Sequence, residues 1–141
     1  MIPNACTKHA SCVALAGAGV LIIGKSGTGK SSLALQLMAL GCQLVADDKT
    51  DIRSVDGQLL ASCPKAIQGQ IEARGIGILA AEPTPNTILR LVVNMDQTET
   101  ARLPVPMTIQ ICGVELPLLH VSVQTHFPAA ILQYLKGGRI A

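Results

Sequence analysis

The chain has 141 residues, a length typical of one domain, and 49% of them are apolar, enough for a packed core. Only 14% of the residues are charged and the net charge is +2, which argues against an extended basic surface for nucleic acid. The aromatic side chains are Phe127 and Tyr134 alone, too few to form a platform on which single-stranded bases would stack.

Five cysteines are scattered along the chain without a C-x-x-C pair: Cys6, Cys12, Cys42, Cys63 and Cys112. An odd number of cysteines favours buried free thiols in a reducing compartment over a disulfide framework. Thiolate metal ligands usually come in closely spaced pairs, so a metal site of this kind is disfavoured. The longest apolar run, 12–23, is interrupted by glycines and too short to cross a membrane. We therefore expect structural strands there and a cytoplasmic protein without a membrane segment.

The first elements along the chain are expected to be two strands, a helix and a third strand. Apolar runs predict short strands at 10–16 and 19–23. A helix is expected at 30–40, where leucines recur on one face and Gly41 follows as a left-handed cap. The run at 43–46 predicts a buried strand.

A glycine-rich loop lies between the strand at 19–23 and the helix at 30–40. Its residues, Gly24-Lys25-Ser26-Gly27-Thr28-Gly29-Lys30-Ser31, fill every fixed position of the phosphate-binding pattern G-x-x-x-x-G-K-[ST]. The glycines let successive backbone N–H groups point at one centre, where the helix N-terminus adds its positive dipole end. Lys30 would reach the outer phosphates, and the Ser31 hydroxyl would coordinate Mg²⁺. A turn that binds nothing is the alternative, but the flanking strand and helix favour a nucleoside triphosphate site.

An acidic pair, Asp47-Asp48, follows the buried strand at 43–46. This strand and the one before the glycine-rich loop would present their carboxyl ends to one crevice. Adjacent residues of an extended segment point to opposite sides, so one carboxylate could support Mg²⁺ while the other faces an incoming hydroxyl as a general base. That division suits phosphoryl transfer. A solvated turn with a helix cap is the alternative.

The rest of the chain predicts mainly strands. The Asp56-Gly57 pair indicates a hairpin, and a polar, Pro-bearing loop is expected at 95–106. Strands are expected at 50–55, 58–62, 71–79 (with a loop at one end), 88–93, 107–111 and 114–123, and helical turns at 64–68 and from Pro128 to Gly137. This order predicts an α/β domain with a mixed sheet rather than strict βαβ alternation, and no linker divides residues 1–141.

Three pieces of the sequence together resemble the catalytic domain of HPr kinase/phosphorylase. They are the stretch from His9 through the glycine-rich loop, the run Leu40-Gly41-Cys42-Gln43-Leu44-Val45-Ala46-Asp47-Asp48, and Ile71-Glu72-Ala73-Arg74-Gly75-Ile76-Gly77-Ile78. The last is similar to a family signature that reads L-E-I-R-G-[LI]-G-I. The spacings between the pieces also agree, and the resemblance covers residues 7 to 79. It implies the phosphate-loop fold shared with PEP carboxykinase, and a catalytic domain without the N-terminal domain of long members.

The resemblance implies roles at the matching positions. The loop from Gly24 to Ser31 would hold ATP, with Ser31 on Mg²⁺. Asp48 would take the proton from a serine hydroxyl of the phosphocarrier HPr, while Asp47 would assist at the metal. Glu72 would be a further metal ligand, although outside this motif it would be read as a surface glutamate.

Two further residues are matched to the family's catalytic groups. His9 matches a histidine near the base, and Arg102 is matched, across a shortened segment, to an arginine that stabilises charge on the transferring phosphoryl group. His120 and His126 have no such support and default to structural roles. Family members form hexamers, and the low charge of this chain is compatible with apolar surface covered by neighbouring subunits.

One family motif has no counterpart here. Near the C-terminus the family carries P-V-R-P-G-R-N, which is tied to its dephosphorylating activity, whereas this chain has Val121-Ser122-Val123-Gln124-Thr125-His126-Phe127. The missing arginines would hold inorganic phosphate as the attacking nucleophile. We therefore expect an Mg-ATP-dependent HPr serine kinase that regulates a phosphotransferase system, with weak or absent phosphorylase activity. The alternatives are a small-molecule kinase with the same loop and a nucleotide-sensing module without catalysis.

Overall fold

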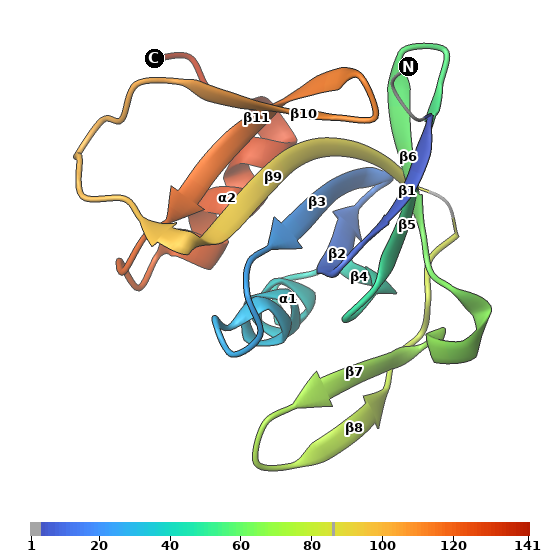
Figure 1. Cartoon of the computed structure of the whole chain (residues 1–141). Helices are drawn as coiled ribbons and strands as arrows, with labels where there is room; N and C mark the ends of the chain where they lie inside the picture. Colours follow the sequence, from blue (N-terminus) through green and yellow to red (C-terminus); the bar gives the residue numbers. More distant parts are fainter. Residues whose placement is uncertain (1–3, 86) are drawn as a thin grey trace.

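A curled sheet forms the frame of the structure, a computed structural model that describes residues 4–85 and 87–141 (Figure 1). Two helices and a short hairpin pack around this sheet. The elements in chain order are β1 (Ala5–Lys8), β2 (Ala10–Leu15), β3 (Ala18–Ile23), α1 (Lys30–Ala39), β4 (Gln43–Ala46), β5 (Thr50–Val55), β6 (Gln58–Ser62), the 3-10 turn η1 (Lys65–Ile67), β7 (Gln70–Ala73), β8 (Gly77–Ala80), β9 (Thr87–Thr98), β10 (Met107–Ile111), β11 (Val114–Val121) and α2 (Phe127–Gly137).

The long strand β9 joins two parts of the sheet. One of its edges pairs with β3 in parallel, while the other pairs with β6 near Ile88 and with β11 from Val92 onward. The order along the sheet is β1-β5-β6-β9-β3-β2-β4, and β10 pairs with β11. Because β2 runs antiparallel to both β3 and β4, strands β3, β4, β9 and β11 share one direction. Their carboxyl ends therefore meet at one edge, where open α/β sheets hold ligands.

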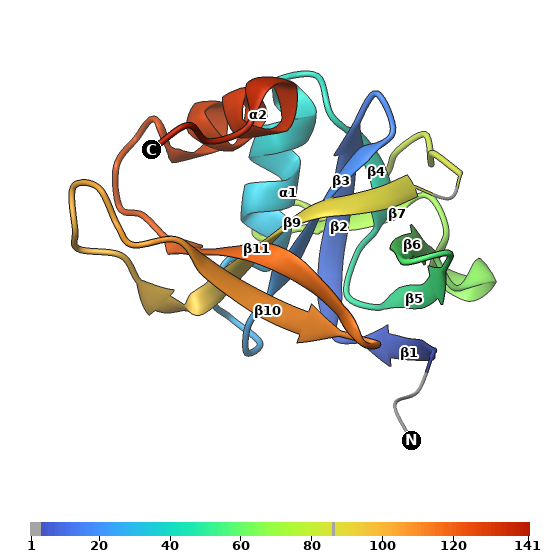
Figure 2. The same cartoon turned by 90° about the horizontal axis from the view of Figure 1, so that it is seen from above.

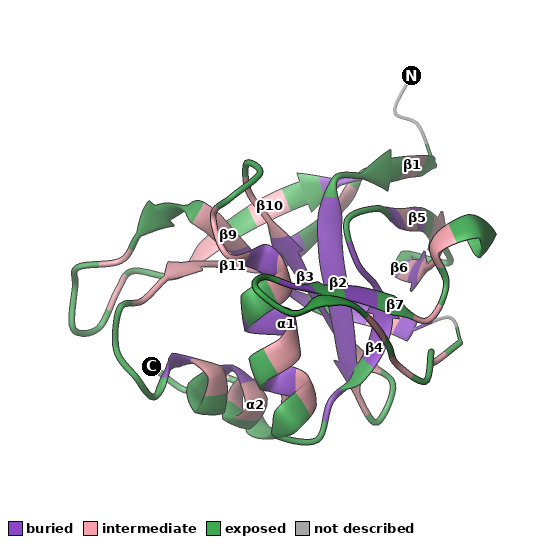
Figure 3. Cartoon of the chain, turned by 90° about the horizontal axis from the view of Figure 1, so that it is seen from below, coloured by how far each residue is buried: buried purple, intermediate pink, exposed green. Residues whose placement is uncertain are grey.

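Two apolar clusters cover the opposite faces of the central strands, because successive side chains of a strand point to opposite sides. On one face Ile22 packs with Leu33 and Leu37 of α1 and with Ile131 of α2. On the other face Leu21 packs with residues of β5, β6, β10 and β11 around which the sheet curls. Helices α1 and α2 lie beside each other (Figure 2), and β2 is buried along nearly its whole length (Figure 3).

A separate hairpin, β7–β8, projects from the sheet and packs against α1 (Figure 1). Its first strand alternates strictly, with Ile71 and Ala73 buried and Gln70 and Glu72 exposed. The buried residue Ile71 joins the apolar cluster around α1. This packing turns the Glu72 face of β7 away from the core and toward the carboxyl edge of the sheet.

Most predicted elements are confirmed, including the mixed α/β sheet, the helix after the glycine-rich loop and the hairpin at Asp56-Gly57. Two predictions are wrong in part, and one strand was missed. The single strand expected at 71–79 is the hairpin β7–β8, which turns at Arg74, Gly75 and Ile76. The first third of the loop expected at 95–106 belongs to β9, which runs to Thr98. Strand β1 was not expected at all.

Two of these differences depend on pairing with a distant strand, and the third depends on a tight turn. Strand β1 is four mostly exposed residues that gain their partners from β5. The polar end of β9 is extended because β11 lies beside it. At 71–79, Gly75 has φ +87, a backbone conformation in which glycine allows the tight turn.

All five cysteines are free thiols in the described structure. Burial raises the pKa of Cys12, Cys42 and Cys63, the last also through the Asp51 and Asp47 carboxylates. Burial and the neighbouring thiol of Cys6, whose Sγ lies 3.2 Å away, raise the pKa of Cys112 to about 11. Neither helix is long and apolar enough to cross a membrane, as far as the described residues go.

A core substitution tests the packing around β3. Ile22 is fully buried, so Ile22→Ala removes apolar contacts from the centre of the fold and should lower the free energy of unfolding by about 2–5 kcal/mol. The matched control is Ile76→Ala, since Ile76 is 78% exposed; its effect should stay within about 0.5 kcal/mol. Urea denaturation measures both variants. Equal effects would contradict the assigned core.

Candidate functional site

The glycine-rich loop folds tightly at the end of β3. The Lys25 carbonyl accepts hydrogen bonds from the Thr28 N–H at 3.3 Å and from the Thr28 hydroxyl at 2.7 Å. The buried Lys30 ammonium donates to the carbonyls of Gly24, at 2.7 Å, and Lys25, at 3.0 Å. Gly24 has φ +145, and a Cβ there would lie 2.9 Å from the Thr28 Oγ1 and 3.0 Å from the Met95 Cβ. Any larger residue at position 24 would therefore distort the loop.

The loop leads into the N-terminus of α1 with its donors free of side-chain caps. Gly29, with φ +98, precedes the helix and no side chain caps it; the first turn carries no acidic residue. The first N–H groups of a helix lack intrahelical acceptors and lie at the positive end of the dipole. A Cβ at Gly27 would meet nothing within 4 Å, so the loop is open on this side. This arrangement suits an anion such as a phosphate group.

Strand β9 braces the outer side of the loop. The Lys25 N–H donates to the Asp96 carboxylate at 2.9 Å, and the Asp96 N–H donates to the Asn94 side chain at 2.9 Å. Asp96 was expected in a polar loop, without a role at the site. Its position at the end of β9 becomes visible only once β9 is known to pair with β3 and β11.

The Asp47 carboxylate lies behind the loop and is 6% exposed. Its Oδ1 accepts hydrogen bonds from the hydroxyls of Ser11 and Ser31, both at 2.7 Å, and its Oδ2 accepts one from the Glu72 N–H at 3.0 Å. These donors come from β2, α1 and β7. A buried carboxylate needs such donors to offset its desolvation, and here they fix the position of Ser31.

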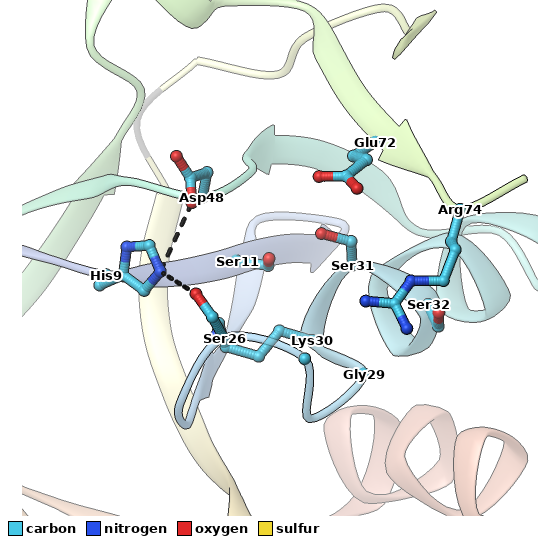
Figure 4. Close-up of a pocket in the computed structure, with 11 residues that line it drawn as sticks. His9, Ser11, Ser26, Gly29, Lys30, Ser31, Ser32, Asp48, Glu72 and Arg74 are labelled. Carbon is cyan, nitrogen blue, oxygen red and sulfur yellow. Dashed lines mark hydrogen bonds and ion pairs between the residues drawn. The ribbon is translucent and has the colours of Figure 1, made fainter. Parts of the chain in front are cut away.

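Asp48 points away from Asp47 toward solvent, with 64% of its side chain exposed. Its φ is +70, and the Lys49 N–H donates to the Asp47 carbonyl at 2.8 Å, which closes a tight three-residue turn centred on Asp48. Such turns are rare and strained, and strained residues cluster at functional sites. The His9 Nε2 lies 3.5 Å from the Asp48 Oδ1 and 3.4 Å from the Ser26 hydroxyl, and so joins the acidic residue to the loop (Figure 4).

A cavity of about 160 Å³ opens at this point, between the loop, the β4 end and the β7–β8 hairpin (Figure 4). It contains both signs of charge, because Lys30 and Arg74 line it together with Asp48 and Glu72. The lining residues are His9, Ser11, Ser26, Gly27, Gly29, Lys30, Ser31, Ser32, Asp48, Glu72 and Arg74.

The structure therefore brings together most of the residues singled out in the sequence. The loop, His9, Asp48 and Glu72 line one cavity, with Asp47 hydrogen-bonded directly behind it. Arg102 is exposed between β9 and β10 and does not line this cavity. Arg74, which the sequence analysis quoted within a motif but assigned no role, does line it. Its signal was available, because it lies two residues after Glu72 in the same strand-like motif.

The donor set fits magnesium bound together with phosphates. Ser31 gives its proton to Asp47 at 2.7 Å, which leaves the hydroxyl lone pairs free for a cation. Glu72 lines the same cavity. Within residues 4–85 and 87–141, no group of three or more His, Cys, Asp or Glu side chains is arranged as a metal centre. Mg²⁺ is commonly held by one or two carboxylates plus substrate phosphates, so a site with few protein ligands suits it.

Comparison with known proteins identifies the family. The family model of the HPr serine kinase C-terminal domain matches residues 2–132. The chain belongs to this family. A solved structure titled as the Hpr(Ser) kinase/phosphatase from Coxiella burnetii superposes with a TM-score of 0.77 at 28% identity, over 92% of this chain and 93% of that one. The expected fold, the phosphate-loop type shared with PEP carboxykinase, is thereby confirmed.

Curated relatives named HPr kinase/phosphorylase align over most of the chain. The protein of an Exiguobacterium species is 37% identical over an alignment of 129 residues that covers 82% of this chain and 42% of the relative. That of an Acidovorax species is 36% identical over an alignment of 132 residues that covers 84% of this chain and 41% of the relative. The chain thus spans less than half the length of these relatives. A shorter match, to Clostridium beijerinckii, is 48% identical over 71 residues, 50% of this chain and 24% of the relative.

The two neighbouring aspartates should respond differently to the same substitution. In the wild type three donors share the Asp47 carboxylate. Asp47→Asn replaces one carboxylate oxygen by an amide NH₂ group, so at least one buried donor loses its acceptor. The free energy of unfolding should fall by about 1–3 kcal/mol. The Asp48 side chain is exposed, and asparagine also tolerates the positive φ of this position. Asp48→Asn should therefore change the free energy of unfolding by no more than about 0.5 kcal/mol. Urea denaturation compares them. A neutral Asp47→Asn would show that the hydrogen-bond cluster does not stabilise the fold.

Proposed function

We propose that this chain is an ATP- and Mg-dependent protein serine kinase that phosphorylates HPr and thereby regulates a phosphotransferase system. Family membership supports the reaction class, and the resemblance also favours a homo-oligomer, as a hexamer. The observation that carries the proposal is the cavity that Asp48 shares with the glycine-rich loop, from here on called the phosphate loop. This loop, which would hold the phosphate donor, and an exposed acidic side chain line the same space there.

The loop would bind and orient the phosphates. Its N–H groups and Lys30 neutralise their charge, since phosphoryl transfer depends mainly on positioning and charge stabilisation. Ser31 would ligate Mg²⁺, held in orientation by its 2.7 Å hydrogen bond to Asp47, and Glu72 would lie on the same side of the cavity. The metal, when bound, supplies charge neutralisation at the phosphates. In this arrangement Asp47 acts mainly through Ser31.

Asp48 would accept the proton of the acceptor serine. Its carboxylate is 64% exposed, and His9, 3.5 Å away, would orient it. Arg74 lines the cavity and would stabilise charge on the transferring phosphoryl group. The resemblance implied this role for Arg102, which lies outside the cavity lining, and for Arg102 the role stays a prediction. A base so exposed can be reached by a loop of another protein.

The shape of the cavity favours a protein acceptor over a small metabolite. Sites for small molecules are usually clefts of roughly 300–1,000 Å³ that bury most of the ligand. The cavity in front of Asp48 holds about 160 Å³, which is room for phosphate groups and one serine side chain rather than for a whole second substrate. This observation speaks against the small-molecule kinase alternative.

The direct test is phosphorylation of HPr with labelled ATP and Mg²⁺. We expect acid-stable phosphoserine on HPr, and Asp48→Asn should lower the transfer rate by about 10²–10⁴-fold because the base is lost. ATP affinity, measured by calorimetry, should remain within about threefold of wild type, since neutralising this exposed carboxylate costs no phosphate contact.

The matched control is Asp56→Asn, the same substitution at an exposed residue with φ +51 in the β5–β6 turn. It should leave both affinity and rate unchanged. Undiminished transfer by Asp48→Asn would refute the assignment of the base. Turnover of a metabolite without HPr would favour the small-molecule kinase, and ATP binding without any transfer would favour the sensing module.

The reverse reaction should be weak or absent. The segment 121–127, where the family carries two arginines tied to dephosphorylation, contains no arginine here, so inorganic phosphate lacks the groups that would hold it as a nucleophile. Phosphoserine-HPr incubated with the protein and excess phosphate should release little pyrophosphate. The Acidovorax relative serves as the positive control, and a comparable rate of release by this chain would overturn the expectation.

A further inference from the structure

The thiols of Cys6 and Cys112 lie next to each other, although 106 positions separate the two residues in the chain. Their Sγ atoms are 3.2 Å apart, and both residues are partly buried against the apolar cluster around which the sheet curls. The sulfur atoms of a disulfide are about 2.0 Å apart, so this pair needs to approach by only about 1 Å to reach bonding distance. Nothing in the proposed phosphoryl transfer uses these thiols.

The pair lies where the two ends of the curled sheet meet. Hydrogen-bonded strands follow one another in the order β1-β5-β6-β9-β11-β10. Cys6 belongs to β1, at one end of this series, and Cys112 to the turn that joins the two strands at the other end. Figure 2 shows the tip of the β10–β11 hairpin beside β1. A bond between the two sulfur atoms would therefore close the series covalently.

The turn that carries Cys112 favours other residues than cysteine. Ile111 pairs with Val114, so Cys112 and Gly113 form a two-residue hairpin loop, with φ values of +48 and +78. Positive φ at both positions is typical of a type I′ turn, in which asparagine, aspartate or glycine is preferred at the first position. The conformation of the turn thus gives no reason for a cysteine there, whereas the contact with Cys6 does.

We propose that Cys6 and Cys112 form a redox modification site, at which hydrogen peroxide produces a disulfide within the chain. One thiolate attacks an oxygen atom of the peroxide, the O–O bond breaks, and the hydroxide that leaves takes up the proton of that thiol to become water. The other sulfur attacks the resulting sulfenic acid, and a second water leaves with the second thiol proton. Two thiols are thereby oxidised to one disulfide, and one peroxide is reduced to two water molecules.

The two thiols have different parts in this reaction. Burial and the Cys6 thiol raise the pKa of Cys112 to about 11, so its thiolate is scarce at neutral pH. Thiolates rather than thiols attack peroxides. We therefore expect the sulfenic acid on Cys6, with Cys112 as the residue that resolves it from the adjacent position.

The disulfide would stabilise the folded chain without blocking the phosphate loop. The sulfur atoms are already in contact, and neither residue lines the cavity in front of Asp48. The bond would hold β1, four mostly exposed residues paired with β5, against the β10–β11 turn. A link between residues so far apart in the chain also removes much conformational freedom from the unfolded state. This inference does not depend on the proposed function, because it concerns thiols outside that site.

The first test needs no variant. The reduced protein is treated with excess hydrogen peroxide, the remaining thiols are blocked with iodoacetamide, and unreduced peptides are identified by mass spectrometry. We expect a link between Cys6 and Cys112 within one chain, the loss of two of the five free thiols, and reversal by dithiothreitol. Links that involve other cysteines or join two chains, sulfinic acid on Cys6 without a link, or five unmodified thiols would each overturn the proposal.

The second test measures thermal unfolding before and after oxidation. Oxidation should raise the Tm of the wild type by about 5 °C or more, and Cys6→Ser should abolish that gain. Cys112→Asn should abolish it too, while the reduced form of this variant melts no lower than the reduced wild type, because asparagine is preferred in this turn.

The matched control is Cys63→Ser, at another partly buried thiol, which donates to the Pro64 carbonyl at 3.3 Å rather than to a second thiol. This variant should keep both the Cys6–Cys112 link and the gain in Tm. An oxidised wild type that melts at the temperature of the reduced protein, or a gain in Tm that survives Cys6→Ser, would contradict the proposal.

Discussion

The buried carboxylate of Asp47 is the interaction on which the rest of the site depends. It collects the hydroxyls of Ser11 and Ser31 and the backbone N–H of Glu72, and so ties β2, α1 and the projecting hairpin to the end of β4. An ionised group removed from water needs this many donors, because its desolvation would otherwise destabilise the fold. The requirement is met only when the four segments adopt one relative position. That position is also the one in which the phosphate loop, Glu72, Arg74 and Asp48 surround one cavity.

The two sides of the phosphate loop differ in the charge of the side chains that line them. Charged side chains line the cavity at the β4 end, whereas none lines the hollow between α1 and the segment 121–125. A nucleotide has the same polarity, with a highly charged triphosphate joined to a neutral nucleoside. The sheet order explains why one loop can face both environments, because β3 lies between the strands that supply them.

The parts of the site that were predictable from sequence are those encoded within a few neighbouring residues. The loop from Gly24 to Ser31 carries its own turn glycines, its lysine and the start of its helix, so the pattern alone located it. Asp48 was recognisable because it ends a short apolar strand. The contribution of Asp96 was not, since it depends on the pairing of β9 with two other strands. Arg74 was visible within the motif around Glu72, but no role was assigned to it. Arg102 is the opposite case: it was expected at the site from a motif match across a shortened segment, but it does not line the cavity.

At Asp48 the backbone conformation favours one residue and the proposed chemistry requires another. A non-glycine residue held in such a conformation costs roughly 1–3 kcal/mol, a sizeable part of the stability of a small domain. Glycine at position 48 would relieve that cost but would remove the exposed carboxylate beside His9. Selection for thermal robustness alone would thus remove the base that we propose. A library screened for stability should accumulate glycine there, and one screened for phosphoryl transfer should retain aspartate.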